Sequence, residues 1–190
     1  MSIDKDWLKR ACDIVGDDGV LLTAQDTEAY GHDEYAMDTY SQIPKAVVKP
    51  ATEAQVAEIV SLCAETGVPV TARGGGTGLS AACVPLAEGI VLSMERLDKV
   101  IEADSANYSI TVQAGVTLDQ INKAAGAAGL FFPPHPGDES AMAGGMVATN
   151  AGGARAVKYG TIKRFVLGLQ VVLASGETIE LGGKFLKSSI

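Results

Sequence analysis

The chain has 190 residues, of which 47% are hydrophobic and 20% charged, a composition that fits an ordinary globular domain with a sizeable core. Its net charge of −8 and the absence of a basic stripe argue against nucleic acid as a partner. The first residues lack the apolar region of a signal peptide, and no apolar run approaches the length of a membrane span. We therefore expect a cytoplasmic protein, with peripheral attachment to the inner face of the membrane left open.

Cysteines and histidines are too few for a disulfide framework or a zinc site. Cys12, Cys63 and Cys83 are odd in number, share no CxxC spacing and lie among apolar neighbours, which is typical of small buried residues in a reducing compartment. Only His32 and His135 could add imidazole ligands. We expect no metal site.

The first 72 residues alternate helical and extended signals. In chain order, the elements expected are a helix at 4–15, ordered polar coil at 23–43, a strand at 46–49, a helix at 53–66 and a strand at 68–72. The second helix begins with a capping box formed by Thr52 and Gln55. Gly16 and Gly67 follow the two helices and suit their carboxyl ends.

The remaining residues predict more strands than helices. In chain order, strands are expected at 90–93, 100–103, 109–114, 130–132, 169–174 and 177–181, with one helix at 118–128. That helix has a second capping box, Thr117 with Gln120, and Ser175-Gly176 predicts a two-residue hairpin turn. Because strands lie beside one another as well as alternating with helices, the order favours an α+β fold over a doubly wound parallel sheet.

Two glycine-rich runs, TARGGGTGLS at 71–80 and AGGMVATNAGGARAVKYG at 143–160, each follow an expected strand. Neither contains the Gly-Lys pair of a Walker A loop. A Rossmann turn needs G-x-G-x-x-G at the start of a helix, but the first run has G-x-G-x-G, and Pro85 would interrupt that helix. Glu95 lies at about the distance of the acidic residue that binds the ribose, but alone it is weak evidence for a Rossmann site. Backbone N–H groups of such loops can bind an anion without net positive charge. A clamp on a diphosphate-containing ligand is favoured, with two flexible surface loops as the alternative.

The arginine before the first run has two open roles. Arg73 stands at the end of the strand that precedes the glycines. It could contact a phosphate, or it could pack and pair within the protein, and the spacing does not decide between the two.

Three glycine and proline blocks, PVTARGGGTGLS, FFPPHPG and GGMVATNAGGARAVKYG, resemble in this order the FAD-linked oxidase family of D-lactate dehydrogenases and the glycolate oxidase flavin subunit. The resemblance extends over YGHDEY, PKAVVKPATEAQVAEIV and VLGLQVVLASGETIELGG, and so over nearly the whole chain. It implies a two-lobed α+β FAD-binding domain of the p-cresol methylhydroxylase type. We expect an N-terminal helix and extended segment at 1–45, a first lobe at 46–115 and an incomplete second lobe at 116–190.

The resemblance also implies which residues bind FAD. In the first run the backbone would wrap the pyrophosphate, the proline loop would line the flavin side, and the second run would form a second wall with Asn150 as a side-chain contact. These residues are Arg73, Gly74, Gly75, Gly76, Thr77, Gly78, Leu79, Ser80, Pro136, Gly137, Gly144, Gly145, Ala148, Thr149, Asn150 and Gly153.

Two positions depart from patterns seen among relatives. Some relatives attach FAD covalently through a histidine in the first run, where this chain has Thr77-Gly78-Leu79, so we expect non-covalent FAD. His135 stands where many relatives carry aspartate. A structural role, a contact with flavin or substrate, and a metal ligand remain open for it.

The activity implied by the resemblance is oxidation of a D-2-hydroxy acid, such as lactate or glycolate, by hydride transfer to FAD. An electron-acceptor partner is expected, and no catalytic residue is assigned, because in relatives the base and the carboxylate-binding cation lie beyond the segment matched here. An inactive folded fragment that self-associates through exposed edges is one alternative. Another flavoenzyme of the same fold, such as an ether-lipid synthase or a cell-wall reductase, is a second.

Overall fold

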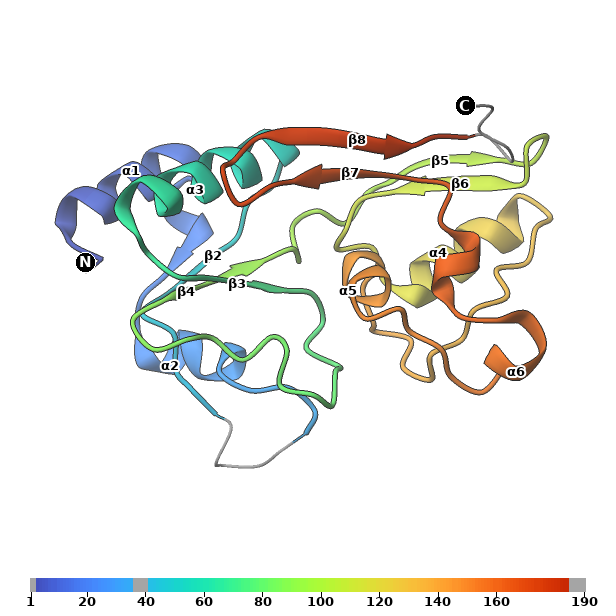
Figure 1. The fold of residues 1–190 in the computed structure, drawn as a ribbon, viewed down its shortest axis with the longest axis horizontal. Coiled ribbons are helices and arrows are strands. Elements are labelled where there is room, and N and C mark those ends of the chain that lie inside the picture. Colours follow the sequence, from blue (N-terminus) through green and yellow to red (C-terminus); the bar gives the residue numbers. More distant parts are fainter. Residues whose placement is uncertain (1–2, 36–40, 185–190) are drawn as a thin grey trace. The chain divides into compact units, whose positions relative to one another are not determined.

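The computed structural model describes residues 3–35 and 41–184, and the chain forms two compact units (Figure 1). Unit 1 comprises Met1–Leu97 together with Val172–Thr178, and unit 2 comprises Asp98–Val171 and the residues from Ile179 onward. The expected lobe boundary at 115/116 assigns two strands to the first lobe that in the structure group with unit 2.

Unit 1 is built on a mixed four-stranded sheet. Its strands are β1 (Val20–Leu21), β2 (Ala46–Val48), β3 (Val70–Arg73) and β4 (Ile90–Ser93). The spatial order is β1-β2-β4-β3, in which β4 pairs in parallel with both neighbours and β1 is antiparallel to β2. Each parallel strand was expected from its short apolar run.

The helices of unit 1 are α1 (Lys5–Val15), η1 (Asp17–Gly19), α2 (Ala24–Thr27), η2 (Glu28–Tyr30) and α3 (Glu53–Thr66). Of these, α1 and α3 were expected from the sequence. Gly67, at φ +68°, takes the left-handed conformation after α3. Thr52 caps the amide of Gln55, but the Gln55 side chain accepts from Ala51, so this capping box is only half formed. The coil expected at 23–43 contains α2 and η2.

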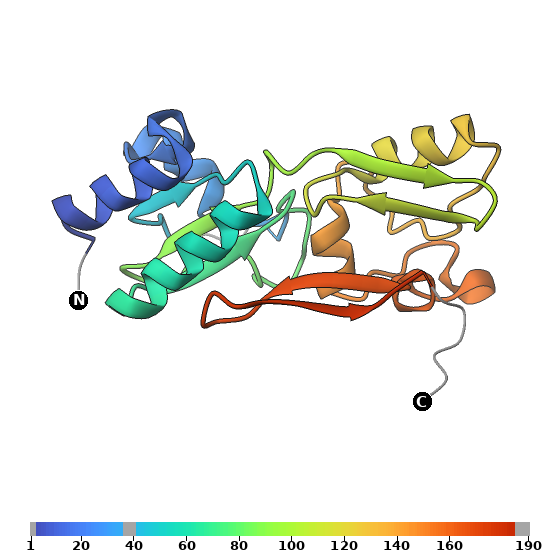
Figure 2. The same cartoon turned by 90° about the horizontal axis from the view of Figure 1, so that it is seen from above.

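The core of unit 1 lies between its helices and its sheet. Helices α1 and α3 pack side by side, as Figure 2 shows. The buried residues of this core are Trp7, Ala11, Val15, Ala46, Val48, Ile59, Leu62, Cys63, Val68, Ile90 and Leu92. Burying these apolar faces at about 25 cal/mol per Å² fixes β3 and β4, whose ends carry the first glycine run and Glu95.

Unit 2 contains two-stranded sheets and short helices. Its elements are β5 (Val100–Asp104), β6 (Ser109–Val112), α4 (Leu118–Ala127), α5 (Ala143–Ala148), α6 (Ala156–Tyr159) and η4 (Ile162–Phe165), with most of β7 (Gly168–Val172) and β8 (Thr178–Gly182). Strands β5 and β6 are antiparallel, and β7 pairs with β8. Helix α4 has the complete capping box expected of Thr117 and Gln120. A core around Val116, Leu118 and Met146 joins α4 to α5.

Two local predictions were wrong. Residues 130–132 form no strand, since Pro133 and Pro134 have no N–H to continue a ladder, and the chain instead makes an isolated bridge at His135. The hairpin between β7 and β8 has a longer turn than expected: Leu173 donates to Glu177, and three residues lie between them. Gly176, at φ +87°, ends this turn in the left-handed region typical of three-residue hairpins.

Among residues 3–35 and 41–184, the helices are too short or too polar to span a membrane.

Candidate functional site

The first glycine run is an open loop that leaves β3. Within the described ranges, no amide N–H of residues 74–80 donates to another group of the protein. Two of its carbonyls are engaged, because the Glu34 amide donates to Gly76 O and Gly78 O at 3.1 Å each. The loop therefore offers a series of amide donors, which is the arrangement that backbone recognition of a phosphate requires.

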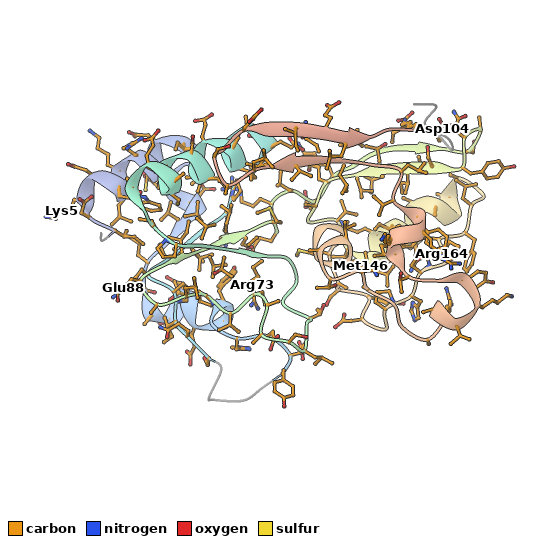
Figure 3. The ribbon with its side chains drawn as sticks, in the orientation of Figure 1. Lys5, Arg73, Glu88, Asp104, Met146 and Arg164 are labelled. Atoms are coloured by element: carbon orange, nitrogen blue, oxygen red, sulfur yellow. The ribbon has the colours of Figure 1, made fainter. Side chains whose placement is uncertain are left out.

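The side chain of Arg73 is directed into the protein beneath this loop (Figure 3). It is only 9% exposed, and it donates to His32 O at 2.5 Å, to Ala29 O at 3.1 Å and to Cys83 Sγ at 3.2 Å. Its guanidinium also lies 5.7 Å from the centre of the Tyr30 ring. Of the two roles open for this side chain, the structure shows packing and pairing.

At Gly76 in the first run, both the backbone conformation and the space available disfavour a side chain. Its φ is +73°, and a Cβ there would overlap the Arg73 guanidinium. At Gly78, by contrast, a Cβ would only come within ordinary contact of Asp33, at 3.8 Å. The glycine at 76 thus lets the loop backbone lie directly on the buried cation.

The second glycine run is not an open loop, because its first part is the short helix α5. The amides of Ala143 and Gly144 already donate to Val116 O and Ala114 O, each at 2.8 Å. A Cβ on Gly144 would lie 3.0 Å from Ala114 Cβ, whereas one on Gly145 would meet no atom within 4 Å. Gly144 therefore allows helix packing, and Gly145 faces open space.

After α5, the second run turns sharply and contacts the proline loop. Asn150 has φ +50°, and its side-chain oxygen accepts from the Lys163 amide at 3.2 Å. Gly153 has φ +91°, and a Cβ there would overlap the carbonyl oxygen of His135. Ala148, Thr149 and Asn150 are exposed at the end of α5. Within unit 2 the structure thus brings together the proline loop and the second run.

His135 borders a cavity of about 280 Å³ in unit 2. The cavity is lined by Asn122, Gly126, Leu130, Phe131, Phe132, His135, Glu139 and Arg155. The His135 Nδ1 atom is buried and has no hydrogen-bond partner in the described part of the chain. No three His, Cys, Asp or Glu side chains among the described residues gather as metal ligands, so the geometry gives no support to a metal-binding role. Pro136 and Gly137 follow directly in the same loop.

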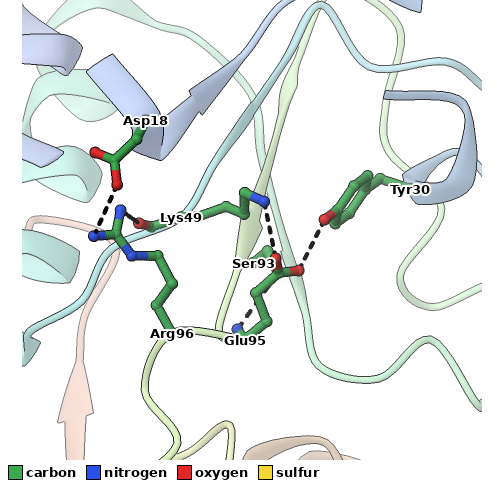
Figure 4. Close-up of polar contacts among 6 residues, drawn as sticks. All are labelled: Asp18, Tyr30, Lys49, Ser93, Glu95 and Arg96. Carbon is green, nitrogen blue, oxygen red and sulfur yellow. Dashed lines mark hydrogen bonds and ion pairs between the residues drawn. The ribbon is translucent and has the colours of Figure 1, made fainter. Parts of the chain in front are cut away.

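A polar cluster that the sequence did not reveal lies at the ends of β2 and β4 (Figure 4). The Glu95 carboxylate accepts from Tyr30 at 2.8 Å, from Lys49 at 2.9 Å and from Ser93 at 2.9 Å. The sequence indicates Glu95 only as a weak candidate for a ribose ligand, and the spacing from residue 30 to residue 95 gives no signal that these side chains meet. Through Tyr30, this cluster anchors η2. Helix η2 shortly precedes Glu34, whose amide donates to the first glycine run.

Opposing effects set the pKa values in this cluster. Burial would raise the pKa of Glu95, but the hydrogen bonds from Lys49, Tyr30 and Ser93 outweigh it, and the pKa lies below its usual value. Burial likewise opposes the charge of Lys49, yet the hydrogen bond to Glu95 raises its pKa above normal. Burial and then the hydrogen bond to Glu95 raise the pKa of Tyr30. The cluster is therefore a neutral tyrosine and a charged pair near neutral pH.

All three cysteines are free thiols. Cys63 is buried, as expected, and burial raises its pKa to about 12. Cys12 and Cys83 are only half-buried. Cys83 takes part in the contacts of Arg73 beside the first run.

The family model of an FAD-binding domain matches residues 44–182. The chain belongs to this family of FAD-binding domains. It is 45% identical over 180 residues to an uncharacterised FAD-linked oxidoreductase of Mycobacterium tuberculosis, covering 95% of this chain and 39% of that protein. It is 52% identical over 143 residues to a D-lactate dehydrogenase of Archaeoglobus fulgidus, and 39% identical over 160 residues to the glycolate oxidase subunit GlcD of Bacillus subtilis.

These last two matches cover 75% and 83% of this chain but 32% and 33% of the relatives. The chain thus spans between about a third and two fifths of the length of the curated relatives it matches.

Solved structures show the same fold. An alkyldihydroxyacetonephosphate synthase superposes with a TM-score of 0.85 at 21% identity, over 94% of this chain and 34% of that one. p-Cresol methylhydroxylase superposes with a TM-score of 0.71 at 20% identity, over 91% and 34%. The expected α+β FAD-binding domain of the p-cresol methylhydroxylase type is confirmed.

Proposed function

We propose that this chain binds FAD non-covalently and serves as the FAD-binding portion of an enzyme that oxidises a D-2-hydroxy acid, of the lactate or glycolate type. The observation that carries the proposal is the series of amide groups at residues 74–80 that have no partner among the described residues. Membership in the FAD-binding domain family makes the FAD pyrophosphate the natural anion for them.

The first glycine run fits a diphosphate for two physical reasons. Hydrogen bonds to a charged group contribute about 1.5–3 kcal/mol each, so four or five would account for much of a micromolar affinity of about 8 kcal/mol. The buried guanidinium of Arg73 lies directly under Gly76, and it supplies local positive charge in a chain of net charge −8. The backbone of residues 73–80 would hold the pyrophosphate.

The other proposed contacts belong to unit 2. Gly145 is open to an approaching ligand, and Ala148, Thr149 and Asn150 are exposed beyond it. Gly144 and Gly153 would act by allowing close packing of the backbone around them, since each approaches a neighbouring residue closely. Pro136 and Gly137 would line the flavin side of the loop that begins at His135.

The residues of the first glycine run and those beside it support non-covalent attachment. Residues 74–80 contain no histidine and no cysteine. His32 is engaged through Nδ1 with Asp33 O at 3.0 Å, and Cys83 is held against Arg73. Acid precipitation of the FAD-loaded protein should release all yellow colour into the supernatant. Flavin that stays with the precipitate would contradict non-covalent binding.

The substrate class comes from the relatives alone. A D-lactate dehydrogenase and a glycolate oxidase subunit are each at least 39% identical over at least 75% of this chain. In such an oxidation FAD supplies the acceptor for the hydride from the carbon that bears the hydroxyl. We propose an electron acceptor that reoxidises the flavin as the partner, and we assign no catalytic base among the described residues.

Two measurements test this proposal. Titration of the chain with FAD, followed by quenching of flavin fluorescence, should give saturable binding at micromolar concentration or tighter. The full natural polypeptide that contains this chain should reduce an artificial electron-accepting dye with D-lactate or glycolate. Activity with L-lactate alone, or with neither acid, would overturn the substrate assignment but leave FAD binding intact.

A further inference from the structure

The segment at residues 29–35, within the run YGHDEY, lies against the first glycine run and precedes residue 44, where the match to the family begins. We propose that this segment is part of the FAD site and that Asp33 is a positioning residue that fixes the amide groups of the glycine loop. The inference rests on the proposed function, because it takes FAD as the ligand of that loop.

Asp33 ties the far end of the loop to the segment. It is only 4% exposed; its Oδ2 atom accepts from the Ala81 amide at 2.7 Å, and its Oδ1 atom accepts from the Tyr35 amide at 3.0 Å. Ala81 has φ +55°, a conformation that is strained for a residue with a Cβ. The carboxylate therefore holds in place a strained residue that marks the end of the glycine run.

The backbone amide of Glu34, the next residue, fixes the middle of the glycine loop. Glu34 N–H donates to the carbonyls of both Gly76 and Gly78. Glycine peptides can rotate easily, and a carbonyl oxygen turned toward the ligand would repel a phosphate. By holding these two carbonyls, the segment keeps them from the anion and leaves the amides of the loop for it.

Arg73 holds the other end of the segment. It donates to the carbonyls of Ala29 and His32 and lies against the ring of Tyr30. The Tyr30 hydroxyl in turn donates to Glu95 at the end of β4. The segment is thus fixed at both ends before any ligand binds, so the cost of ordering the loop does not fall on FAD binding.

The test compares Asp33→Asn with Asp4→Asn in the full natural polypeptide. Asparagine at 33 can accept a hydrogen bond from only one of the two amides, those of Tyr35 and Ala81, and it places its NH₂ group against the other. Loss of one such hydrogen bond, about 1.4 kcal/mol, weakens FAD binding by roughly tenfold. Asp4 is the matched control, since its carboxylate also accepts a backbone amide, that of Trp7, but it caps α1 away from the loop. Asparagine caps helices as well as aspartate, so this variant should bind FAD like the wild type.

A rescue variant separates positioning from a general loss of fold. Ala81→Gly removes the strain at φ +55°, so the loop depends less on Asp33 to hold it. Asp33→Asn/Ala81→Gly should therefore regain part of the FAD affinity lost in Asp33→Asn and restore the visible circular dichroism of bound flavin. Unfolding of each apoprotein, measured in parallel, shows how much of the change is stability.

Hydrogen exchange of the wild type supplies a test that needs no variant. Saturating FAD should slow exchange in the peptide that spans residues 29–35, although the proposed ligand contacts lie in residues 73–80. A wild type that binds no FAD would overturn the proposed function itself. A wild type that binds FAD without protecting this peptide, or an Asp33→Asn protein that binds as tightly as Asp4→Asn, would overturn the positioning role and leave the function standing.

Discussion

The two glycine-rich runs look alike in sequence but use glycine for different physical purposes. In the first, residues 74–80 leave their amides without a partner among the described residues, and the neighbouring segment holds two of their carbonyls. In the second, the amides of Ala143 and Gly144 are already bonded to unit 2, and Gly144 and Gly153 admit close neighbours. Glycine gives access to the backbone in one run and close packing of the backbone in the other.

This difference means that glycine content alone does not locate a phosphate site. A loop binds an anion only if its amides are free and its carbonyls are turned away, and both conditions depend on what lies behind it. Here that support comes from Asp33 and Glu34, more than 40 positions earlier in the chain. The Asp33 carboxylate accepts a hydrogen bond from the end of the loop, and the Glu34 amide donates to two of its carbonyls. Four substitutions can break or sharpen the comparison.

Gly153→Ala should have the largest effect, on stability. A Cβ would overlap the backbone carbonyl of His135, which cannot move aside as a flexible side chain could, and φ is +91°. We expect a loss of about 3 kcal/mol, or roughly 6–12 °C in Tm, measured by thermal unfolding of the apoprotein. Gly152→Ala is the matched control, since its Cβ would be in ordinary contact with Ala156 at 3.5 Å. Equal Tm values for the two variants would remove the packing role of the second run.

Gly76→Ala should affect ligand binding most. The new Cβ would meet the Arg73 guanidinium at φ +73°, so both the loop and the cation beneath it must shift. We expect the apoprotein to lose about 1–2 kcal/mol and the Kd for FAD to rise at least about tenfold. In Gly78→Ala the apoprotein should keep its stability, because the nearest atom is 3.8 Å away. Unchanged FAD affinity in Gly76→Ala would show that the first run is not the anion site.

Glu95→Gln tests the anchor behind the first run through its pH dependence. Because the folded pKa of Glu95 lies below its usual value, the stability it provides is present above a pH of about 4.3 and lost as the pH falls through the folded pKa. Lys49 has a raised pKa, so its contribution is present below a pH of about 10.4 and lost as the pH rises through its folded value.

The expected loss in Glu95→Gln is about 1–2 kcal/mol at neutral pH, with a shallower decline of stability on the acid side. Urea unfolding at several pH values measures both. Ser93→Ala removes only one neutral donor to the same carboxylate and should keep the acid dependence of the wild type. If the stability of Glu95→Gln fell with decreasing pH as steeply as that of the wild type, other carboxylates would be responsible for the acid dependence.

Gly145→Ala should have the smallest effect and the opposite sign. The position is inside α5, its φ is not positive, and a Cβ would meet no atom within 4 Å. Alanine should stabilise the helix by about 0.5–1 kcal/mol, seen as a slightly higher Tm of the apoprotein. If Gly145 contacts FAD as we propose, the same variant should bind FAD more weakly. A gain in stability with no loss of affinity would leave this residue outside the site.

Local rules predicted most of the elements. Capping boxes predicted the starts of α3 and α4, and Gly16 and Gly67 predicted the ends of α1 and α3, because these signals act within one turn of helix. Short apolar runs gave β2, β3 and β4. The errors came where neighbours in sequence mislead: the apolar residues before Pro133 could not pair as a strand, and the last hairpin needed a third turn residue.

The sequence by itself determined the fold family and the presence of FAD-type glycine blocks, because both reside in the order of short motifs. Only the tertiary structure decided what the residues around those blocks do. It placed the Arg73 side chain against carbonyls rather than free for a phosphate, brought Asp33 to the amide of Ala81, and joined Tyr30 to Glu95. These contacts link residues 44 to 65 positions apart, and folding creates them by burying polar groups that must then find partners, which no local pattern of residues records.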